Sequence, residues 1–274
     1  MTVLSGKPLS ENMDKQFCMQ YVEVMEHKDK IAIVTGGARG FGFGFAQALC
    51  AAGATVVILD RDGDEARRAA NSLSADGASC SAVSCDVSDE QAVDSAVAHI
   101  VETLGGVNIL INNAGLLANR YSTDFSIISR ADVRAVLEVN VMGVINCSVA
   151  VRSAMARRGG GVILNLASIA GYTIPGPYGL SKLAVRGLTV SLAREFARDN
   201  IRVNAVAPGL MATESVMADL PSDMISHFIN DLQLLKRQGL PGDIVDAAMF
   251  LCSDKASFIT GETLRVSGGF PLEV

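Results

Sequence analysis

The chain has 274 residues, 49% of them hydrophobic, and a formal net charge of −6 at pH 7. This length and composition suit one large α/β domain with a substantial buried core. The acidic balance, with a pI of about 5.1 and no basic stripe, argues against nucleic acid or an anionic membrane as a partner. No apolar run approaches the roughly 20 residues that a membrane-spanning helix needs.

The six cysteines are scattered, with no C-x-x-C pair, and most lie in apolar segments. A free cysteine in such a place behaves as a small hydrophobe, so no disulfide framework is expected. The N-terminus shows no charged start followed by an apolar segment, so a signal peptide is not predicted and a reducing cytoplasm is the expected location. The three histidines, His27, His99 and His227, lack metal-ligand spacing, so no metal site is predicted.

Residues 1–29 are mixed and polar and precede the first clear strand. Two interpretations of this arm remain open. It is either a disordered tail, because termini are ordered only where they are tied down, or a segment that folds over a partner subunit. Residues 30–274 are predicted to form one domain.

Seven short runs after the arm are rich in Val and Ile, as strands buried on both faces are. They are Ile31–Val34, Thr55–Leu59, Ser79–Cys85, Asn108–Ile111, Gly161–Leu166, Ile201–Val206 and Thr263–Val266. Segments with helical periodicity lie between them: Gly42–Ala52, Asp64–Ala75, Asp89–Leu104, Ala131–Arg158, Tyr178–Arg198 and Pro241–Cys252. Ser88 is a plausible N-cap, and Pro241 suits a first helical turn. The alternation predicts an α/β fold with a doubly wound, Rossmann-like parallel sheet of about seven strands flanked by helices, in a single domain.

A glycine-rich turn, Thr35–Gly42, joins the first predicted strand to the first predicted helix. Its glycines, Gly36, Gly37, Gly40 and Gly42, permit a tight turn and let the backbone approach a pyrophosphate. The N-terminus of the following helix offers free N–H groups and a favourable dipole to the phosphates. This placement between a strand and a helix predicts a dinucleotide site.

Asp60 ends the second predicted strand, 18 residues beyond Gly42. A carboxylate there can accept hydrogen bonds from the adenosine ribose and would repel a 2′-phosphate, which favours NAD over NADP. Arg39 and Arg61 oppose this argument, because guanidinium groups bind phosphate well. The prediction is NAD, with NADP as the alternative.

Tyr178 is followed four residues later by Lys182, with Ser168 upstream. A spacing of four on a helix places both side chains on one face. A nearby ammonium favours the phenolate and lowers the tyrosine pKa from its usual value of about 10. The pair therefore predicts an acid/base for an alcohol oxygen. A hydrolase built on Ser168 would need a histidine partner, and no histidine lies near it in the sequence.

These motifs together resemble the short-chain dehydrogenase/reductase family, of the compact single-domain kind, over residues 30–270. The resemblance implies that Ser168, Tyr178, Lys182 and the helix residue Asn140 are catalytic. It also implies that Asp86 and Val87 contact adenine, that Asn112–Gly115 forms a turn along the cofactor, and that Pro208, Gly209 and Thr213 meet the nicotinamide carboxamide. The implied cofactor-binding residues are Gly36, Arg39, Gly40, Phe41, Gly42, Asp60, Arg61, Asp86, Val87, Asn113, Ala114, Gly115, Tyr178, Lys182, Pro208, Gly209 and Thr213.

The resemblance also implies a division of labour among the catalytic residues. Tyr178 exchanges the proton, and Lys182 lowers its pKa and holds the nicotinamide ribose. Ser168 bonds the substrate oxygen, and Asn140 supports a water that links Lys182 to solvent. The cofactor does the hydride chemistry, and the protein positions it.

Two features depart from the family's pattern. The interval from Ser168 to Tyr178 is about three residues shorter than usual, and the shortening falls within Gly171–Pro177. That loop usually borders the substrate. Phe41 stands where a smaller aliphatic residue is common, and its ring is expected to pack inward.

The expected substrate is a medium-sized, largely apolar secondary alcohol or ketone. Five residues are expected to line its pocket: Leu116, Leu117, Tyr172, Ile174 and Met211. The alternatives are a 3-oxoacyl thioester on an acyl carrier, reduced with NADP(H), then polyols or sugars, and, in another class, a non-catalytic nucleotide-sensing protein. Met211, Met217 and Met224 form either ordinary core or an apolar substrate lid.

A homotetramer is expected, partly because such enzymes commonly pair the helices equivalent to Ala131–Arg158 and Tyr178–Arg198. Both segments carry more small or apolar residues than one buried stripe requires. The apolar C-terminal residues Phe270–Leu272 would also suit coverage by a partner subunit.

Overall fold

A seven-stranded parallel sheet forms the centre of the protein in a computed structural model that describes residues 26–75, 77–213 and 221–272. Its strand order is β3-β2-β1-β4-β5-β6-β7. The strands are β1 (Ile31–Thr35), β2 (Thr55–Asp60), β3 (Cys80–Ser84), β4 (Ile109–Asn112), β5 (Gly161–Leu166), β6 (Ile201–Pro208) and β7 (Thr263–Val266). The predicted Rossmann-like fold class is confirmed.

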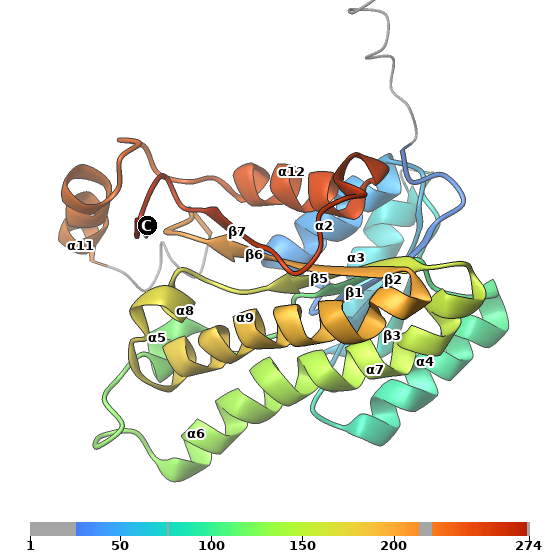
Figure 1. Ribbon diagram of the computed structural model, residues 1–274, viewed down its shortest axis with the longest axis horizontal. Helices are drawn as coiled ribbons and strands as arrows, with labels where there is room; N and C mark the ends of the chain where they lie inside the picture. The colour runs from blue at the N-terminus through green and yellow to red at the C-terminus, as the bar shows by residue number, and fades with distance from the viewer. Residues whose placement is uncertain (1–25, 76, 214–220, 273–274) are drawn as a thin grey trace, which may run out of the picture.

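Helices cover both faces of this sheet (Figure 1). One face carries α2 (Gly40–Ala51), α3 (Gly63–Ala75) and α12 (Pro241–Cys252), and the other carries α4 (Glu90–Leu104), α7 (Gly143–Arg157) and α9 (Gly176–Phe196). A separate hydrophobic core fills each helix–sheet interface. Phe45 and Leu49 of α2 are fully buried on one face, and Ile100 and Phe196 are almost fully buried on the other. Burial on both faces explains why the strands read as continuous apolar runs.

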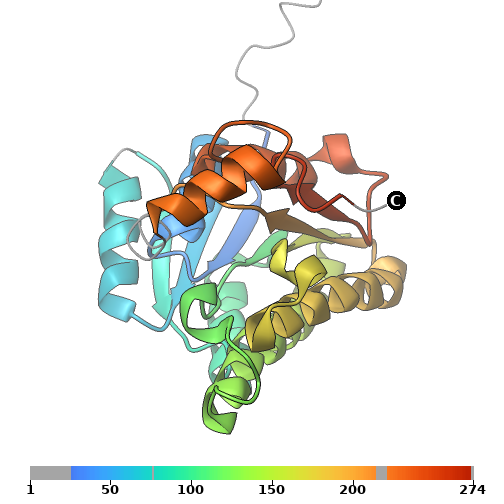
Figure 2. The same cartoon turned by 90° about the vertical axis from the view of Figure 1, so that its left-hand side faces the viewer.

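The shorter elements are α5 (Ala118–Tyr121), α6 (Arg130–Leu137), η2 (Glu138–Met142), α8 (Ala170–Thr173), η3 (Ala197–Asp199), α11 (Ser222–His227), η4 (Phe228–Leu232) and η5 (Asp254–Ala256). Of these, α5 directly follows β4 and α8 directly follows β5, so both lie at the carboxyl ends of the strands. Together with α11 they gather at one end of the molecule, which faces the viewer in Figure 2.

The strand order reverses between β1 and β4, which are neighbours in the sheet. Ile33 of β1 is in register with Val57 of β2 on one side and with Leu110 of β4 on the other. In a doubly wound sheet, the carboxyl ends of the strands at such a reversal border the ligand crevice. The glycine turn after β1 and the turn after β4 therefore meet there.

The predicted single helix Ala131–Arg158 is wrong in one respect, because it is interrupted. Helix α6 ends at Leu137, a π-helical turn runs from Glu138 to Met142, and α7 begins at Gly143. A π turn adds one residue to a helical turn, and hydrophobic periodicity is too coarse to detect it. The predicted N-cap of α4 is also off by one: the Asp89 side chain, and not that of Ser88, accepts the bond from Ala92 N–H.

Residues 130–157, taken as one helical stretch, are long and apolar enough to cross a membrane by length and composition. No uninterrupted apolar run of that length stands out in the sequence, because charged residues interrupt this one. A single such stretch is weak support for a membrane span, since the core helix of a soluble protein passes the same test. Here its second half, α7, packs against α4 and the sheet.

The last residues of the N-terminal arm are attached to the domain. His27 N–H donates to Ala52 O at 3.0 Å, and the His27 side chain is buried. Glu26 forms an ion pair of 3.1 Å with Lys255. The rest of the arm lies outside the described residues, so both interpretations of it stay open.

Candidate active site

The glycine turn between β1 and α2 has the shape that a dinucleotide pyrophosphate requires. A Cβ on Gly42 would lie 2.1 Å from the Gly36 carbonyl oxygen, so only glycine fits there. Gly36 and Gly40 have φ of +60° and +57°, which a residue with a Cβ rarely adopts. A Cβ on Gly40 would meet no atom within 4 Å, so the N-terminus of α2 faces open space. Its first N–H groups lack partners within the helix and suit a phosphate.

The turn is held to the end of β4 by hydrogen bonds. The Asn113 amide nitrogen donates to the carbonyls of Thr35 and Gly36, both at 2.9 Å. The Thr35 hydroxyl accepts the backbone N–H groups of Asn113 and Ala114, both at 3.0 Å. These contacts join the first and fourth strand ends into one surface. The Phe41 ring stacks on Phe45 with centroids 6.4 Å apart and packs against the core, as expected.

Asp60 lies at the end of β2 with both carboxylate oxygens engaged by backbone N–H groups, from Ala38 at 3.2 Å and Asp62 at 3.1 Å. Asp86 lies at the end of the neighbouring strand. Hydrogen bonds from Ser88 lower the pKa of Asp86, with a contribution from the positive charge of Arg61. Val87 is buried, and its carbonyl accepts the Asn146 amide at 3.0 Å.

Ser168, Tyr178 and Lys182 come together beside the turn after β4. The Ser168 side chain lies close enough to the Tyr178 hydroxyl to lower its pKa. Lys182 Nζ lies 5.8 Å from the centre of the Tyr178 ring. A Cβ on Gly115 would lie 3.7 Å from the same nitrogen, so Lys182 reaches the surface lined by Asn113–Gly115.

Burial shifts the pKa values of Lys182 and Tyr178. Burial lowers the pKa of Lys182 to about 8, while its ammonium donates to the Leu166 carbonyl at 2.7 Å. Burial also raises the pKa of Tyr178 above its ordinary value, and the Ser168 side chain opposes part of that rise. The helical spacing predicted that Lys182 lowers the Tyr178 pKa. That expectation is not met here, because desolvation of the phenolate outweighs the opposing contribution of Ser168.

Asn140 lies in the π-helical turn η2, which directs its side chain toward α9. Its amide oxygen accepts Leu116 N–H at 2.7 Å, and its amide nitrogen donates to the Leu116 carbonyl at 3.2 Å and to the Ser181 hydroxyl at 3.1 Å. The Ser181 hydroxyl in turn donates to the Tyr178 carbonyl at 2.7 Å. Asn140 therefore links the turn after β4 to the helix that carries Tyr178. Its role in holding a water for Lys182 stays a prediction.

The short loop between Ser168 and Tyr178 is tightly constrained. Ile174 has a φ of +53°, which is unusual for a β-branched residue, and Gly176 has a φ of +59°. A Cβ on Gly176 would lie 2.2 Å from the Thr123 carbonyl oxygen. The Ser168 hydroxyl accepts Ala170 N–H at 3.1 Å, which starts α8. The loop thus holds both catalytic candidates in place despite its reduced length.

The Pro208–Gly209 turn lies against the same region. The Pro208 carbonyl accepts Ile169 N–H at 3.0 Å, and Thr213 N–H donates to the Met211 carbonyl at 2.9 Å. The structure therefore brings the candidate nicotinamide end of the site next to the loop that follows Ser168.

One of the five expected substrate-pocket residues, Met211, lies elsewhere. Met211 is buried in the core beneath α12, because Gly239 leaves room for its thioether there. Tyr172 is covered by guanidinium groups, with Arg186 at 3.4 Å and Arg265 at 4.9 Å from the ring centre. Leu117 and Ile174 are exposed, by 53% and 44%, and so remain candidates to contact an apolar substrate. Met217 lies outside the described residues.

Two polar residues at the site, Ser181 and Asp62, were not predicted from the sequence. Ser181 lies three residues after Tyr178, so helical spacing could have placed it on the same face. Asp62 forms an ion pair with Arg39 at 3.2 Å and accepts Glu65 N–H at 3.1 Å. The spacing of Asp62 and Glu65 at the start of a predicted helix is the signal that could have marked Asp62 as a helix cap.

Comparisons with known proteins agree with this arrangement. A family model described as Enoyl-(Acyl carrier protein) reductase matches residues 36–271. A 3alpha-hydroxysteroid dehydrogenase of Mediterraneibacter gnavus is 42% identical over 247 residues, which cover 88% of this chain and 96% of that protein.

Two solved structures extend the comparison to complexes. A 7 alpha-hydroxysteroid dehydrogenase complexed with NADH and 7-oxo glycochenodeoxycholic acid has a TM-score of 0.83 and 33% identity, covering 90% of this chain and 96% of that one. A gluconate 5-dehydrogenase from Burkholderia cenocepacia in complex with NADP and tartrate has a TM-score of 0.85 and 31% identity, covering 92% and 99%. With the fold and the ordered motifs, these matches show that the chain belongs to the short-chain dehydrogenase/reductase family of oxidoreductases.

Proposed function

We propose that the protein transfers a hydride between a nicotinamide cofactor and a secondary alcohol or its ketone, with Tyr178 as the acid/base. The observation that carries this proposal is the neighbouring pair Ser168 and Tyr178, with Lys182 Nζ 5.8 Å from the Tyr178 ring centre, beside a glycine turn shaped for a pyrophosphate.

Each side chain has a defined task in this reaction. The Tyr178 hydroxyl accepts the alcohol proton in oxidation and returns it in reduction. The Ser168 hydroxyl bonds the same substrate oxygen and stabilises the charge that develops on it. Lys182, with a pKa of about 8, changes its protonation near neutral pH and can supply positive charge beneath the phenol. The nicotinamide ring supplies the hydride donor or acceptor and, when oxidised, a positive charge that favours the phenolate.

The test is the substitution Tyr178→Phe, which removes the hydroxyl and keeps the ring. Turnover should fall by about 100-fold or more, because general acid–base catalysis contributes about that much. Cofactor affinity, measured by fluorescence titration, should stay within about twofold. Tyr172→Phe is the matched control, since its ring is held by Arg186 and lies outside the catalytic group. Unchanged turnover in Tyr178→Phe would refute the mechanism and favour a nucleotide-sensing protein.

NAD(H) is the proposed cofactor, because a carboxylate at the end of β2, here Asp60, is suited to bind the adenosine ribose and to repel a 2′-phosphate. Of the two solved complexes, one contains NADH and the other NADP, so relatedness alone does not choose between them. Steady-state kinetics with both cofactors decide the question, and a strong preference for NADP(H) would overturn this part of the proposal.

The proposed substrate class is a bulky, largely apolar alcohol or ketone such as a hydroxysteroid. Two observations support it: Leu117 and Ile174 expose apolar surface at the site, and two relatives carry hydroxysteroid dehydrogenase names. The description of the matching family model favours an acyl-carrier thioester as the second candidate. A panel of hydroxysteroids, acyl-carrier thioesters and polyols separates these. Selective turnover of acyl-carrier thioesters would reverse the order.

We also propose a cytoplasmic homotetramer. The outer surface of η2, α7 and α9 exposes an unusual number of large apolar side chains for a monomer. They are Met142, Val149, Leu180, Leu183 and Val190. A second copy of the chain that packs on this face would cover them. The five cysteines of the described residues are all free thiols, which suits a reducing compartment.

A further inference from the structure

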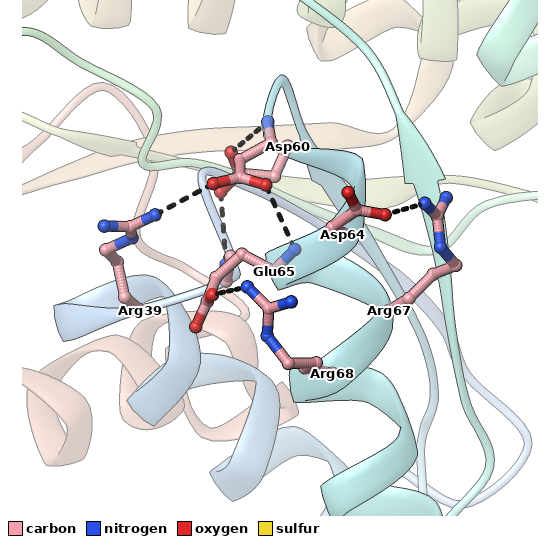
Figure 3. A network of polar contacts seen from close by, with 8 residues as sticks. Arg39, Asp60, Asp64, Glu65, Arg67 and Arg68 are labelled. Carbon is pink, nitrogen blue, oxygen red and sulfur yellow. Dashed lines mark hydrogen bonds and ion pairs between the residues drawn. The ribbon is translucent and has the colours of Figure 1, made fainter.

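An ion pair crosses the edge of the predicted ribose site. Arg39 belongs to the glycine turn and reaches across to Asp62, in the loop between β2 and α3, with Nη2 3.2 Å from Oδ2. Both side chains are largely exposed, by 72% and 47%. Figure 3 shows Arg39 directed at the carboxylates that follow β2.

Asp60 fixes the position of this pair. Its two oxygens accept the backbone N–H groups of Ala38, which precedes Arg39, and of Asp62. The backbone of Asp62 and of the residue before Arg39 is therefore bound to one carboxylate, which stands where the adenosine ribose is expected. An additional phosphate on that ribose would arrive between Asp60, Asp62 and Arg39.

Arg61, the other cation near the predicted ribose site, acts on a different carboxylate. The positive charge of Arg61 acts on Asp86, at the end of β3, and contributes to lowering the pKa of that carboxyl. Farther along α3, Arg67 pairs with Asp64 and Arg68 pairs with Glu65. Of these arginines, Arg39 is the one that extends from the glycine turn to the loop after β2, and Asp62 is the carboxylate with which it forms an ion pair.

We propose that Asp62 holds Arg39 away from the 2′-phosphate position and thereby disfavours NADP(H). This inference rests on the proposed dehydrogenase function and adds a specificity-determining residue to it. Two effects act together: the carboxylate competes for the guanidinium, and its charge repels a phosphate that carries about two negative charges. Because the pair is exposed and screened, the combined effect on affinity is modest, about fivefold to tenfold.

The substitution Asp62→Asn tests this without removing a helix cap. Asp62 accepts Glu65 N–H and so starts α3. Asparagine caps helices as well as aspartate does, so α3 should keep its first turn. Asp64→Asn is the matched control, because it removes one exposed carboxylate two residues away that pairs with Arg67 and not with Arg39.

The measurement is the dissociation constant of NADH and of NADPH for the full-length protein, by fluorescence titration at low ionic strength. Asp62→Asn should tighten NADPH binding by about fivefold to tenfold and change NADH binding by less than about twofold. Asp64→Asn should change the ratio of the two constants by less than about twofold. The double variant Asp62→Asn with Arg39→Gln should lose most of the gain, since the freed guanidinium is the proposed phosphate ligand.

Three results would overturn the inference. One is an unchanged ratio in Asp62→Asn, and another is an equal change in Asp64→Asn, which would show a general effect of charge. The third is a gain that stays undiminished when Arg39→Gln is added. Wild-type protein that prefers NADPH would contradict the proposed NAD(H) preference but leave this inference intact, because it concerns the change in ratio. Wild-type protein that binds neither cofactor would overturn both.

Discussion

The burial of Lys182 in the candidate active site costs stability and also lowers its pKa. Lys182 belongs to α9, and its buried ammonium donates to the Leu166 carbonyl. Burial lowers its pKa to about 8. A buried charge with a single hydrogen bond is expensive, so the site strains the fold at neutral pH. The same burial brings the lysine close to its titration point, where it is useful as a proton-linked positive charge.

The pH dependence of stability tests this account. The folded protein should bind fewer protons at Lys182 than the unfolded chain between pH 8 and 10.5, the two pKa values. Stability should therefore rise with pH across that window, relative to a variant without the lysine. The unfolding free energy of wild type minus that of Lys182→Met should therefore be about 2 kcal/mol larger at pH 9.5 than at pH 7. Denaturant titrations at both pH values measure it, and a constant difference would contradict the lowered pKa.

Spacing alone predicted that Tyr178 and Lys182 share a helical face, because the positions of residues four apart depend only on the helix. It did not predict the direction of the Tyr178 pKa, since desolvation depends on residues from several strands and helices. Spacing also did not predict the hydrogen-bond partners of Asn140, because Leu116 and Ser181 are 24 and 41 residues away in the sequence.

At the scale of elements, the turn between β1 and α2 depends on glycine at one position above all. Gly42 lies where a Cβ would approach the Gly36 carbonyl at 2.1 Å and the Asn113 amide nitrogen at 2.6 Å. Neither neighbour can move freely, because Asn113 also holds the turn to β4. The close approach joins the nucleotide turn to the sheet, so a disturbance there should affect both binding and stability.

Gly42→Ala should therefore lower the unfolding free energy by about 1–3 kcal/mol, the usual cost of overpacking, and weaken cofactor binding by about tenfold or more. Thermal unfolding and fluorescence titration measure the two effects. Gly242→Ala is the control: it adds the same methyl in the first turn of α12, where no atom lies within 4 Å. It should be neutral or stabilise by up to about 1 kcal/mol. Equal effects of the two substitutions would contradict a special role for Gly42.

The interrupted helix α6–η2–α7 marks the limit of periodicity as a predictor. The sequence predicts one helix over Ala131–Arg158 because apolar residues recur with helical spacing throughout. The π-helical turn at Glu138–Met142 adds a residue without breaking that pattern, and it places Asn140 at the site. Extra turns of this kind often occur at functional sites.

At the scale of the whole molecule, the apolar surface over η2, α7 and α9 predicts an oligomer. Val149 and Val190 are 57% and 50% exposed on α7 and α9. Val149→Lys should place a charge in the proposed interface and shift a tetramer to smaller species, because a buried unpaired charge is costly. Light scattering coupled to size exclusion at micromolar concentration measures the mass.

Asn71→Lys is the control for that experiment, since it adds the same charge on the exposed side of α3, away from this face. Its mass should equal that of wild type. A wild-type monomer would contradict the proposed tetramer. An unchanged mass in Val149→Lys would mean that the interface lies on another surface.

The sequence by itself determined the features that depend on a few neighbouring residues. Strand and helix order, the glycine turn and the pairing of Tyr178 with Lys182 all follow from backbone geometry over one or two turns. The doubly wound sheet followed as well, because strands that alternate with helices have few other ways to bury both faces.

Only the tertiary structure decided what lies next to what across long stretches of chain. It placed Met211 in the core beneath α12 and so outside the expected pocket. It paired Arg39 with Asp62, 23 residues away, and so changed the argument about a 2′-phosphate. Contacts, burial and the pKa values they produce are properties of packing, and packing is decided by the whole fold and not by local pattern.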